Sequence, residues 1–301
     1  MGDGSQAGRA AFVSFDKADG KGQMGMGRSG SWLFAVGLAL AMPCGRAHAA
    51  PAVALDYKIY IGGLEALAAT VTIDSDPSRY EVRIDAQTAG MIAKMFPWIV
   101  KIQSTGNMAG DHLQPLQHEQ TTNFQGKDRS VILDYDGHGG FLDRRVVPDA
   151  HEDERDQVPP ELTRNTLDIA SAILAGLKKV DQTGSCDGRV PVFDGRRRFD
   201  LVYSDDGHEH LDGSDVAVYQ GDALRCAIRV EPVAGFWKKN QKKFFTRKVN
   251  GEDEVVPIEV DIARVGAAGI NVPVRVESAS PFGSLVLNLQ HVTDVPVPKG
   301  G

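Results

Sequence analysis

The sequence lacks the short motifs that identify the commonest catalytic and cofactor sites. It has no G-x-S-x-G elbow, no H-E-x-x-H motif, no C-x-x-C pair and no phosphate-binding glycine loop after a strand. Carboxylates are numerous, but no pair sits at a fixed spacing on a recognisable element, so the acid and base of a glycosidase cannot be assigned. We therefore predict no catalytic residue, no cofactor and no metal, and we rank a binding protein above an enzyme.

Cysteine is scarce, with three residues in a chain of 301. Cys44 falls in an N-terminal segment that we expect to be removed, which leaves Cys186 and Cys226. Two remaining cysteines in an exported chain normally pair, and closing a loop of this length would constrain the unfolded chain by ~4 kcal/mol. We predict a disulfide between Cys186 and Cys226, and the alternative is two buried free thiols.

Positive charge is in deficit. The chain has 33 Lys and Arg against 40 Asp and Glu, which gives a formal net charge of −7. Proteins that bind nucleic acid need a surplus of positive charge to neutralise phosphates. The composition therefore argues against a nucleic-acid partner.

The apolar run Trp32–Met42 is too short to span a bilayer. It follows Arg28 and precedes Ala47-His48-Ala49, which together form the pattern of a cleaved secretory signal. Residues 1–25 are polar and Gly-rich, and we interpret them as a non-native start. We predict that residues 1–49 are this start plus the signal, and that the rest is exported to a Gram-negative periplasm. Lipid attachment at Cys44 is the less favoured alternative.

One stretch has the periodicity of a helix. Between Thr166 and Val180 apolar side chains recur at spacings of three and four residues. Thr166 is the expected N-cap, and Asp168 places a negative charge in the first turn. A helix this apolar must be covered on most of its circumference, so we predict that β-structure surrounds it.

The segments on both sides of this helix alternate in the manner of strands. Turn signals such as Gly62-Gly63 separate them without long crossovers, which indicates antiparallel pairing. Residues 143–160 are rich in charge and predict a solvated connector. We predict a mainly β fold in a single domain over residues 50–301. Its curved antiparallel sheet, or open barrel or spiral, would wrap about a dozen strands round one buried helix.

Several stretches together resemble one bacterial family of exported proteins, known as the domain of unknown function number thirty-one-oh-eight. The resemblance rests on Tyr57 to Gly63, Leu167 to Ala172, Val192 to Arg197, and Val272 to Val276 with Phe282-Gly283. It spans nearly the whole chain after the signal. It implies a periplasmic β-rich domain and assigns no catalytic residue. A curved sheet around a helix also looks like the periplasmic lipoprotein carriers, which is a likeness of fold only.

Two aromatic-rich segments are candidate contacts for a ligand or a membrane. In Met91–Val100, the side chains of Met91, Met95, Phe96 and Trp98 can line the mouth of an apolar cavity, or can pack as core. In Phe236–Lys248, aromatic and basic residues alternate without an acidic one, a composition that suits anionic lipid head groups. The residues concerned are Phe236, Trp237, Lys238, Lys239, Lys242 and Lys243; the alternative is a hairpin with rings inward and lysines in water.

Two polar segments have a structural and a functional interpretation. Asp194-Gly195 predicts a tight turn, and the arginines 196–198 after it can hold an anionic group or pair with a carboxylate such as Asp168. We favour the pairing. Ser204–Asp215 carries His208 and His210 among carboxylates, as zinc or calcium sites do, but lacks the spacing of a calcium loop. We favour a solvated hairpin tip.

These patterns favour a periplasmic, envelope-associated binding or chaperone-like module for an apolar or amphipathic ligand, either a lipid or a protein strand. Peripheral contact with a membrane is compatible with this interpretation. The alternatives are a hydrolytic or carbohydrate-active enzyme with a scattered site, and a structural partner in an envelope complex. The sequence does not indicate an oligomeric state.

Overall fold

The computed structural model describes residues 52–110, 112–148, 156–236, 246–249, 252–267, 269–280 and 283–295. In these residues no helix is long and apolar enough to cross a membrane. Most of them form one antiparallel sheet of thirteen strands, and a separate pair of short strands, β11 (Thr246–Val249) and β12 (Glu252–Val255), lies outside it. The predicted fold, a curved antiparallel sheet with one central helix, is confirmed.

The first half of the chain supplies seven strands, each paired with the next. They are β1 (Ala52–Ile61), β2 (Leu64–Ser75), β3 (Arg79–Thr88), β4 (Trp98–Ala109), β5 (His112–Phe124), β6 (Lys127–Tyr135) and β7 (Phe141–Val147). Gly62 and Gly63 both have positive φ, at 56° and 84°, which is the backbone that a tight two-residue hairpin turn requires. A short helix, α1 (Gly90–Met95), interrupts the meander between β3 and β4.

The second half supplies the other six strands of the sheet. They are β8 (Gly188–Phe193), β9 (Arg198–Leu211), β10 (Gly221–Ala234), β13 (Ile258–Val265), β14 (Ile270–Ser280) and β15 (Gly283–Val295). The order across the sheet is β7-β6-β5-β4-β3-β2-β1-β15-β14-β13-β10-β9-β8, so the first and last strands pair in its middle. The edge strands β7 and β8 do not pair with each other, and the sheet remains open.

The two edges nevertheless meet through the turn between β8 and β9. The Nη1 atom of Arg144 on β7 donates to the carbonyl of Gly195 in that turn at 3.0 Å. Gly195 has φ of +86°, and a Cβ there would lie 2.7 Å from the side chain of Val131 on β6. Only glycine fits this close approach without a shift of its neighbours. The curvature of the sheet therefore brings its edges into contact without hydrogen-bonded strand pairing.

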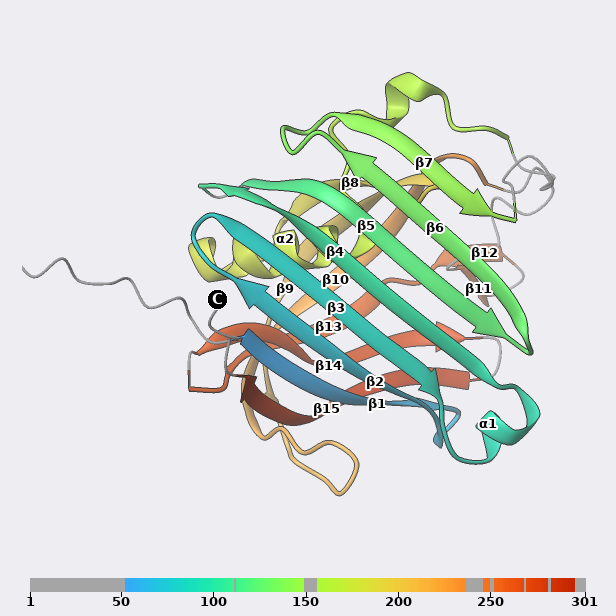
Figure 1. The fold of residues 1–301 in the computed structure, drawn as a ribbon. Coiled ribbons are helices and arrows are strands. Elements are labelled where there is room, and N and C mark those ends of the chain that lie inside the picture. The colour runs from blue at the N-terminus through green and yellow to red at the C-terminus, as the bar shows by residue number, and fades with distance from the viewer. Residues whose placement is uncertain are drawn as a thin grey trace, which may run out of the picture. The chain divides into compact units, whose positions relative to one another are not determined.

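Helix α2 (Ile169–Thr183) lies inside this curve. Figure 1 shows it between the strands of the first half and the yellow-to-orange strands of the second. Ala170 and Leu174 pack with residues of β3 and β5, whereas Ala172, Leu177 and Val180 pack with residues of β8, β9, β10 and β13. Covering both sides of an apolar helix removes its surface from water, and each buried Leu or Val contributes roughly 1.5–3 kcal/mol.

The boundaries of the helix and of the connector differ from those predicted. Leu167 forms a parallel bridge with Val192 on β8, which holds the chain extended, so the helix starts at Ile169 and Asp168, rather than Thr166, is its N-cap. The connector predicted over residues 143–160 starts later, because Asp143 to Val147 pair with β6 as part of β7. A charged, alternating segment is compatible with an edge strand.

The predicted disulfide is confirmed. Cys186 follows α2 and is bonded to Cys226 on β10, with their Cα atoms 6.2 Å apart. Both cysteines are buried in the cluster that also contains Leu177 and Val180 of α2. The bond therefore ties the carboxyl end of the helix to the second half of the sheet. Disulfides of this kind persist in oxidising, exported compartments.

Candidate ligand cavity

An apolar cavity of about 250 Å³ lies between α2 and the inner face of the sheet. Almost all of the surface that lines it is carbon. The lining residues come from β1, β2, β3, α2, β14 and β15, and they are Leu55, Tyr57, Ala69, Val71, Ile73, Val82, Ile84, Ala170, Ile173, Leu174, Leu177, Pro273, Val276 and Leu287. The one side-chain polar atom among them, the Tyr57 hydroxyl, donates to the carbonyl of Pro273 at 3.0 Å. The cavity therefore presents no free polar side chain to an occupant.

The cavity exists because α2 is held mainly by strands on either side of it. Its neighbours are β4 and β5 in the first half of the sheet, and β8 and β14 in the second. Between these contacts, β2, β1 and β15 approach the helix less closely. Their inward side chains include Ala69, which is too small to fill the space. The gap is thus a consequence of the curvature of the sheet and of small side chains in its middle.

Ile173 lies at the edge of the cavity that meets solvent. Its side chain is 42% exposed, whereas Leu174, the next residue of the helix, is 5% exposed. The helical pattern predicted that both would be covered, and this is wrong for Ile173. The described strands leave this side chain partly uncovered, so an apolar side chain stands at the entrance of an apolar cavity.

The amino end of α2 is fixed by a buried carboxylate. Asp168 is fully buried, and its Oδ1 atom accepts hydrogen bonds from the backbone N–H groups of Ala170 and Ser171 at 3.0 Å. The same atom accepts from the Ser104 hydroxyl on β4 at 2.7 Å. The Oδ2 atom accepts from the Ser171 hydroxyl at 2.5 Å. Asp168 therefore caps the helix and binds it to the sheet at once.

Two further residues complete the network. Since the Ser171 proton goes to Asp168, the Tyr80 hydroxyl, 2.8 Å from Ser171 Oγ, is the donor to that oxygen. Since the Ser104 proton also goes to Asp168, the His118 Nδ1 atom, 2.8 Å from Ser104 Oγ, carries a proton and donates it. Nδ1 also lies 3.2 Å from Asp168 Oδ1. Every donor in the cluster thus finds an oxygen.

Ser104, His118 and Asp168 have the residue types of a hydrolase triad but not its arrangement. In a triad the imidazole accepts the serine proton and the carboxylate holds the other ring nitrogen. Here the serine donates to the carboxylate, and one nitrogen of His118 faces both partners. All three side chains are buried, and none lines the cavity. The cluster therefore positions α2 and is unsuited to attack a substrate.

The network also determines the protonation states of Asp168 and Tyr80. Burial alone would raise the pKa of Asp168, but the hydrogen bond and electrostatic attraction of His118, together with Ser171, outweigh it and hold the pKa below its ordinary value. Burial and the negative charge of Asp168 raise the pKa of Tyr80. Asp168 is therefore a carboxylate and Tyr80 a neutral hydrogen-bond donor at physiological pH.

The sequence-predicted contact residues do not line this cavity. Met91, Met95 and Phe96, on α1 and just after it, are 78%, 58% and 49% exposed. The interpretation of these three as core is therefore wrong, and their contact with a ligand or membrane stays a prediction. Trp98 begins β4 and borders a separate cleft.

Phe236 in the second predicted segment is buried, with the guanidinium of Arg197 5.9 Å from the centre of its ring. The other predicted contact residues of this segment lie outside the described residues, and they are Trp237, Lys238, Lys239, Lys242 and Lys243. A membrane contact of this segment stays a prediction.

The arginines after Asp194-Gly195 pair with carboxylates, as favoured, but not with Asp168. Arg197 pairs with Asp194 of its own turn at 2.7 Å, and Arg198 pairs with Asp200 at 2.5 Å. The turn lies against β6 and β7, so Arg197 does not reach the amino end of α2. The bridge between Leu167 and Val192 instead turns Asp168 toward β4.

The histidine-containing segment is a strand rather than a hairpin tip. His208 and His210 lie in β9, which continues to Leu211 and pairs with β10. His210 Nδ1 lies 2.6 Å from the carboxylate of Asp222 opposite it, and this contact raises the pKa of His210. Both partners are solvent-exposed. The pair is therefore a surface contact between strands.

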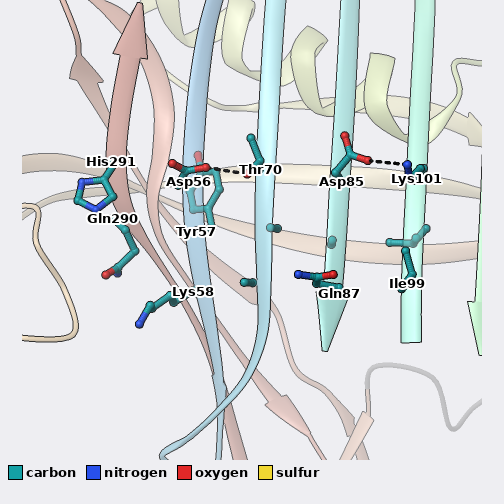
Figure 2. Close-up of a pocket in the computed structure, with 14 residues that line it drawn as sticks. Asp56, Tyr57, Lys58, Thr70, Asp85, Gln87, Ile99, Lys101, Gln290 and His291 are labelled. Carbon is teal, nitrogen blue, oxygen red and sulfur yellow. Dashed lines mark hydrogen bonds and ion pairs between the residues drawn. The ribbon is translucent and has the colours of Figure 1, made fainter. Parts of the chain in front are cut away.

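A shallow trough of about 610 Å³ crosses the outer face of β1–β4 and β15. Figure 2 shows Asp56, Thr70, Asp85 and Lys101 side by side along one row of strands. Thr70 donates to Asp56 at 2.7 Å, and Lys101 lies 4.0 Å from Asp85. Charges that are paired across an exposed surface gain little from a further partner. The trough is thus a weaker candidate site than the apolar cavity beneath α2.

Signals for this site were only partly present in the sequence. Alternation predicted the strands that carry Leu55, Val71 and Ile84, but it could not show that these strands leave a gap beneath the helix. Ser104 and His118 occupy inward positions of strands that are otherwise mixed in polarity, which gave no sign of a buried network.

The comparisons with known proteins concern families without an assigned activity. The model of the family described as "Protein of unknown function (DUF3108)" matches residues 56–290. Among solved structures, the chain is similar to a beta-barrel-like protein of the domain of unknown function DUF1849 from Brucella abortus, with a TM-score of 0.44 and 10% identity. That match covers 81% of this chain and 97% of the other. No curated protein matches the chain.

Proposed function

Because this chain belongs to the DUF3108 family, whose proteins have no known function, we propose a function from its own geometry: it is an exported binding protein that holds the aliphatic part of an apolar or amphipathic ligand in the cavity beneath α2. The observation that carries the proposal is the apolar lining of that cavity. In a chain with a formal charge of −7, fourteen residues line a space in which none of them offers an unpaired polar side chain. Such a space disfavours polar ligands and favours hydrocarbon groups.

The volume limits what the cavity holds. An engineered apolar cavity of roughly 150 Å³ binds benzene, and sites for drug-sized ligands start at roughly 300 Å³. The volume of this cavity, about 250 Å³, lies between those two values. One aliphatic chain, or a segment of one, is therefore the fitting occupant, and a lipid with two acyl chains is too large to be enclosed whole.

Both ends of α2 are fixed, which favours binding to a preformed site. The Asp168 network fixes the amino end to β4, and the Cys186–Cys226 disulfide fixes the segment after the carboxyl end to β10. A site that does not have to be ordered by its ligand binds more tightly for the same contacts. The disulfide also supports an exported location, and we place the protein in the periplasm, where it would handle lipid-like molecules of the cell envelope.

The test is a titration with cis-parinaric acid, a fatty acid that fluoresces when it enters an apolar site. We expect saturable binding to the wild-type protein, and a loss of about tenfold or more in affinity for Ala69→Phe, whose ring fills the cavity. Ala68→Phe is the matched control, because Ala68 neighbours Ala69 on β2 but pairs with Lys58 and Gln87 on the outer face. Circular dichroism establishes that both variants fold. Equal binding by a folded Ala69→Phe protein and the wild type would exclude the cavity as the site.

A further inference from the structure

One end of the sheet carries a group of exposed apolar side chains. Figure 1 shows this end at the lower right, where α1 and the turns β1–β2 and β5–β6 lie at the ends of the strands. The side chains are 43% to 78% exposed, and they are Leu64, Met91, Met95, Phe96 and Phe124. We call this group the apolar tip. Exposed apolar side chains that gather in one place mark a surface of interaction.

Backbone hydrogen bonds hold the three segments of the apolar tip together. The N–H group of Ala89, just before α1, donates to the carbonyl of Ala66 on β2 at 2.8 Å. On the other side of α1, the N–H group of Gln125 in the β5–β6 turn donates to the carbonyl of Pro97 at 3.0 Å. The segment that contains α1 is thus bonded to both of its neighbours, and the apolar side chains of all three lie at one end of the sheet.

The fold imposes the exposure of α1. Thr88, the last residue of β3, closes the base of the loop: its Oγ1 atom accepts from the N–H group of Trp98 at 3.0 Å and donates to the carbonyl of the same residue at 3.4 Å. The six residues of α1 lie beyond this closure, and none of them is buried. Met91 and Met95 are one turn apart, so they share a face of the helix. The described chain leaves that face uncovered.

The segments that form the apolar tip contribute little negative charge. Residues 86–100 and 120–127 contain no carboxylate, although the chain as a whole has a formal charge of −7. Two carboxylates stand next to these segments and Leu64 in the sequence. Glu65 pairs with Lys58 at 2.9 Å, whereas Asp128 is exposed and has no basic partner within ion-pair distance among the described residues.

Two lysines lie among the apolar side chains. Lys94 stands between Met91 and Met95 on α1, and Lys127 pairs with Phe124 where β5 turns into β6. Both lysines are exposed, and neither lies within ion-pair distance of a carboxylate in the part of the chain that the structure describes. A lysine can keep its charge among polar head groups while its stem lies along apolar surface. The two ammonium groups are therefore available to anionic head groups.

We propose that the apolar tip is a membrane-contact surface, through which the protein rests on a bilayer that contains anionic lipids. Met91, Met95 and Phe96 enter the boundary between head groups and acyl chains, and Lys94 and Lys127 lie among the lipid phosphates. A bilayer suits this surface because exposed methionine and phenylalanine side chains can enter lipid without a matching groove, and because the lysines complement the charge of the phosphates.

This proposal goes beyond the proposed function and does not depend on it, since no residue of the apolar tip lines the cavity beneath α2. The experiment is sedimentation of the protein with vesicles of phosphatidylglycerol, and with vesicles of phosphatidylcholine as the neutral comparison. We expect the wild-type protein to bind phosphatidylglycerol about tenfold more strongly.

Met91→Asp tests the apolar part of the surface. It should weaken binding to phosphatidylglycerol about tenfold or more, because a charged side chain replaces one that enters the lipid. Leu142→Asp is the matched control. Leu142 is 65% exposed and lies on β7, next to Phe141, which pairs with Tyr135 at the other end of β6 from Lys127. This variant should bind as the wild type does.

Lys94→Gln tests the charged part of the surface. It should weaken binding to phosphatidylglycerol about fivefold and leave the weaker binding to phosphatidylcholine unchanged. Arg83→Gln is its control, because Arg83 is exposed on β3 and already pairs with Glu81 at 2.6 Å. Ala69→Phe, which fills the cavity, should bind both kinds of vesicle as the wild type does.

The outcomes separate the membrane contact from other occupants and from the proposed function. Equal binding of Met91→Asp and the wild type to phosphatidylglycerol would overturn the proposal, and so would equal binding of the wild type to both kinds of vesicle. A wild-type dimer in sedimentation velocity that Met91→Asp dissociates, without any vesicle binding, would assign the apolar tip to a second copy of the chain instead. Vesicle binding as expected, with no binding of cis-parinaric acid, would support the membrane contact and refute the proposed function alone.

Discussion

The hydroxyl of Ser104 donates to the carboxylate of Asp168 at 2.7 Å, and this bond joins the middle of strand β4 to the N-cap of the only long helix in the described chain. The two residues are 64 positions apart in sequence and are both fully buried. The carboxylate satisfies the first N–H groups of the helix and two hydroxyl donors together, so its loss would leave several buried groups without a partner.

The first prediction concerns this carboxylate. Asp168→Ala should lower the free energy of unfolding by about 3–5 kcal/mol, the usual cost of breaking a buried charged network. Ser104→Ala removes one donor and should cost about 1–2 kcal/mol. Urea denaturation measures both. Asp85→Ala is the control, because Asp85 is exposed on the outer face and should change stability by about 0.5 kcal/mol or less. Similar losses for Asp168→Ala and Asp85→Ala would contradict the role of the network.

The second prediction is a dependence on pH. Because the folded protein lowers the pKa of Asp168, protons bind the unfolded chain more readily than the folded one at this residue. Its contribution to stability is complete above the unfolded pKa of about 3.9, and is lost as the pH falls through the lower folded value. Wild-type stability should therefore fall more steeply below pH ~4 than that of Asp168→Asn, which cannot titrate. Denaturation at a series of acidic pH values tests this; parallel curves for the two proteins would refute it.

The third prediction compares two neighbours on α2. Leu174 is buried and lines the cavity, so Leu174→Ala should cost about 2–5 kcal/mol. Ile173 is largely exposed at the entrance, so Ile173→Ala should cost about 1 kcal/mol or less. Widening the entrance should also speed the association of cis-parinaric acid, which stopped-flow fluorescence measures. Equal stability losses in the two variants would show that the helix is not oriented as described.

The fourth prediction concerns the disulfide. Cys186 and Cys226 are separated by 40 residues, and a loop of that length should contribute about 4 kcal/mol to stability in the chain-entropy model. The double variant Cys186→Ser, Cys226→Ser should therefore unfold at a lower urea concentration. Adding a reductant should shift the wild-type transition in the same direction and leave that of the double variant unchanged. A wild-type transition that is insensitive to reductant, with thiol labelling complete, would exclude this contribution.

Some of this architecture followed from local pattern. The period of 3.6 residues in the segment around Leu174 predicted the helix, and the alternation around Tyr57 predicted the strands that surround it. Gly62-Gly63 predicted a turn that the backbone angles bear out. These features depend on residues that are close together in the chain, and hydrophobic periodicity describes only such local relationships.

The rest depended on contacts between distant segments. Thr166 had the side chain of an N-cap, but the bridge from Leu167 to Val192 moved the helix start to the residue after Asp168. The partner of Asp168 was expected among the arginines after Gly195 and is instead a serine and a histidine from neighbouring strands. The start of the helix and the partners of Asp168 could not be predicted from neighbouring residues, because both depend on how strands far apart in sequence are brought together.

The pairing of β1 with β15 has a consequence for how this protein is made. Ala52 lies opposite Val295, so the middle of the sheet needs a strand from each end of the folded region. During synthesis, the edge of β1 that pairs with β15 has no partner until the last strand has been made. Since long-range pairing is slow and exposed edges invite aggregation, the partly made chain should depend on protection from chaperones until β15 has been made.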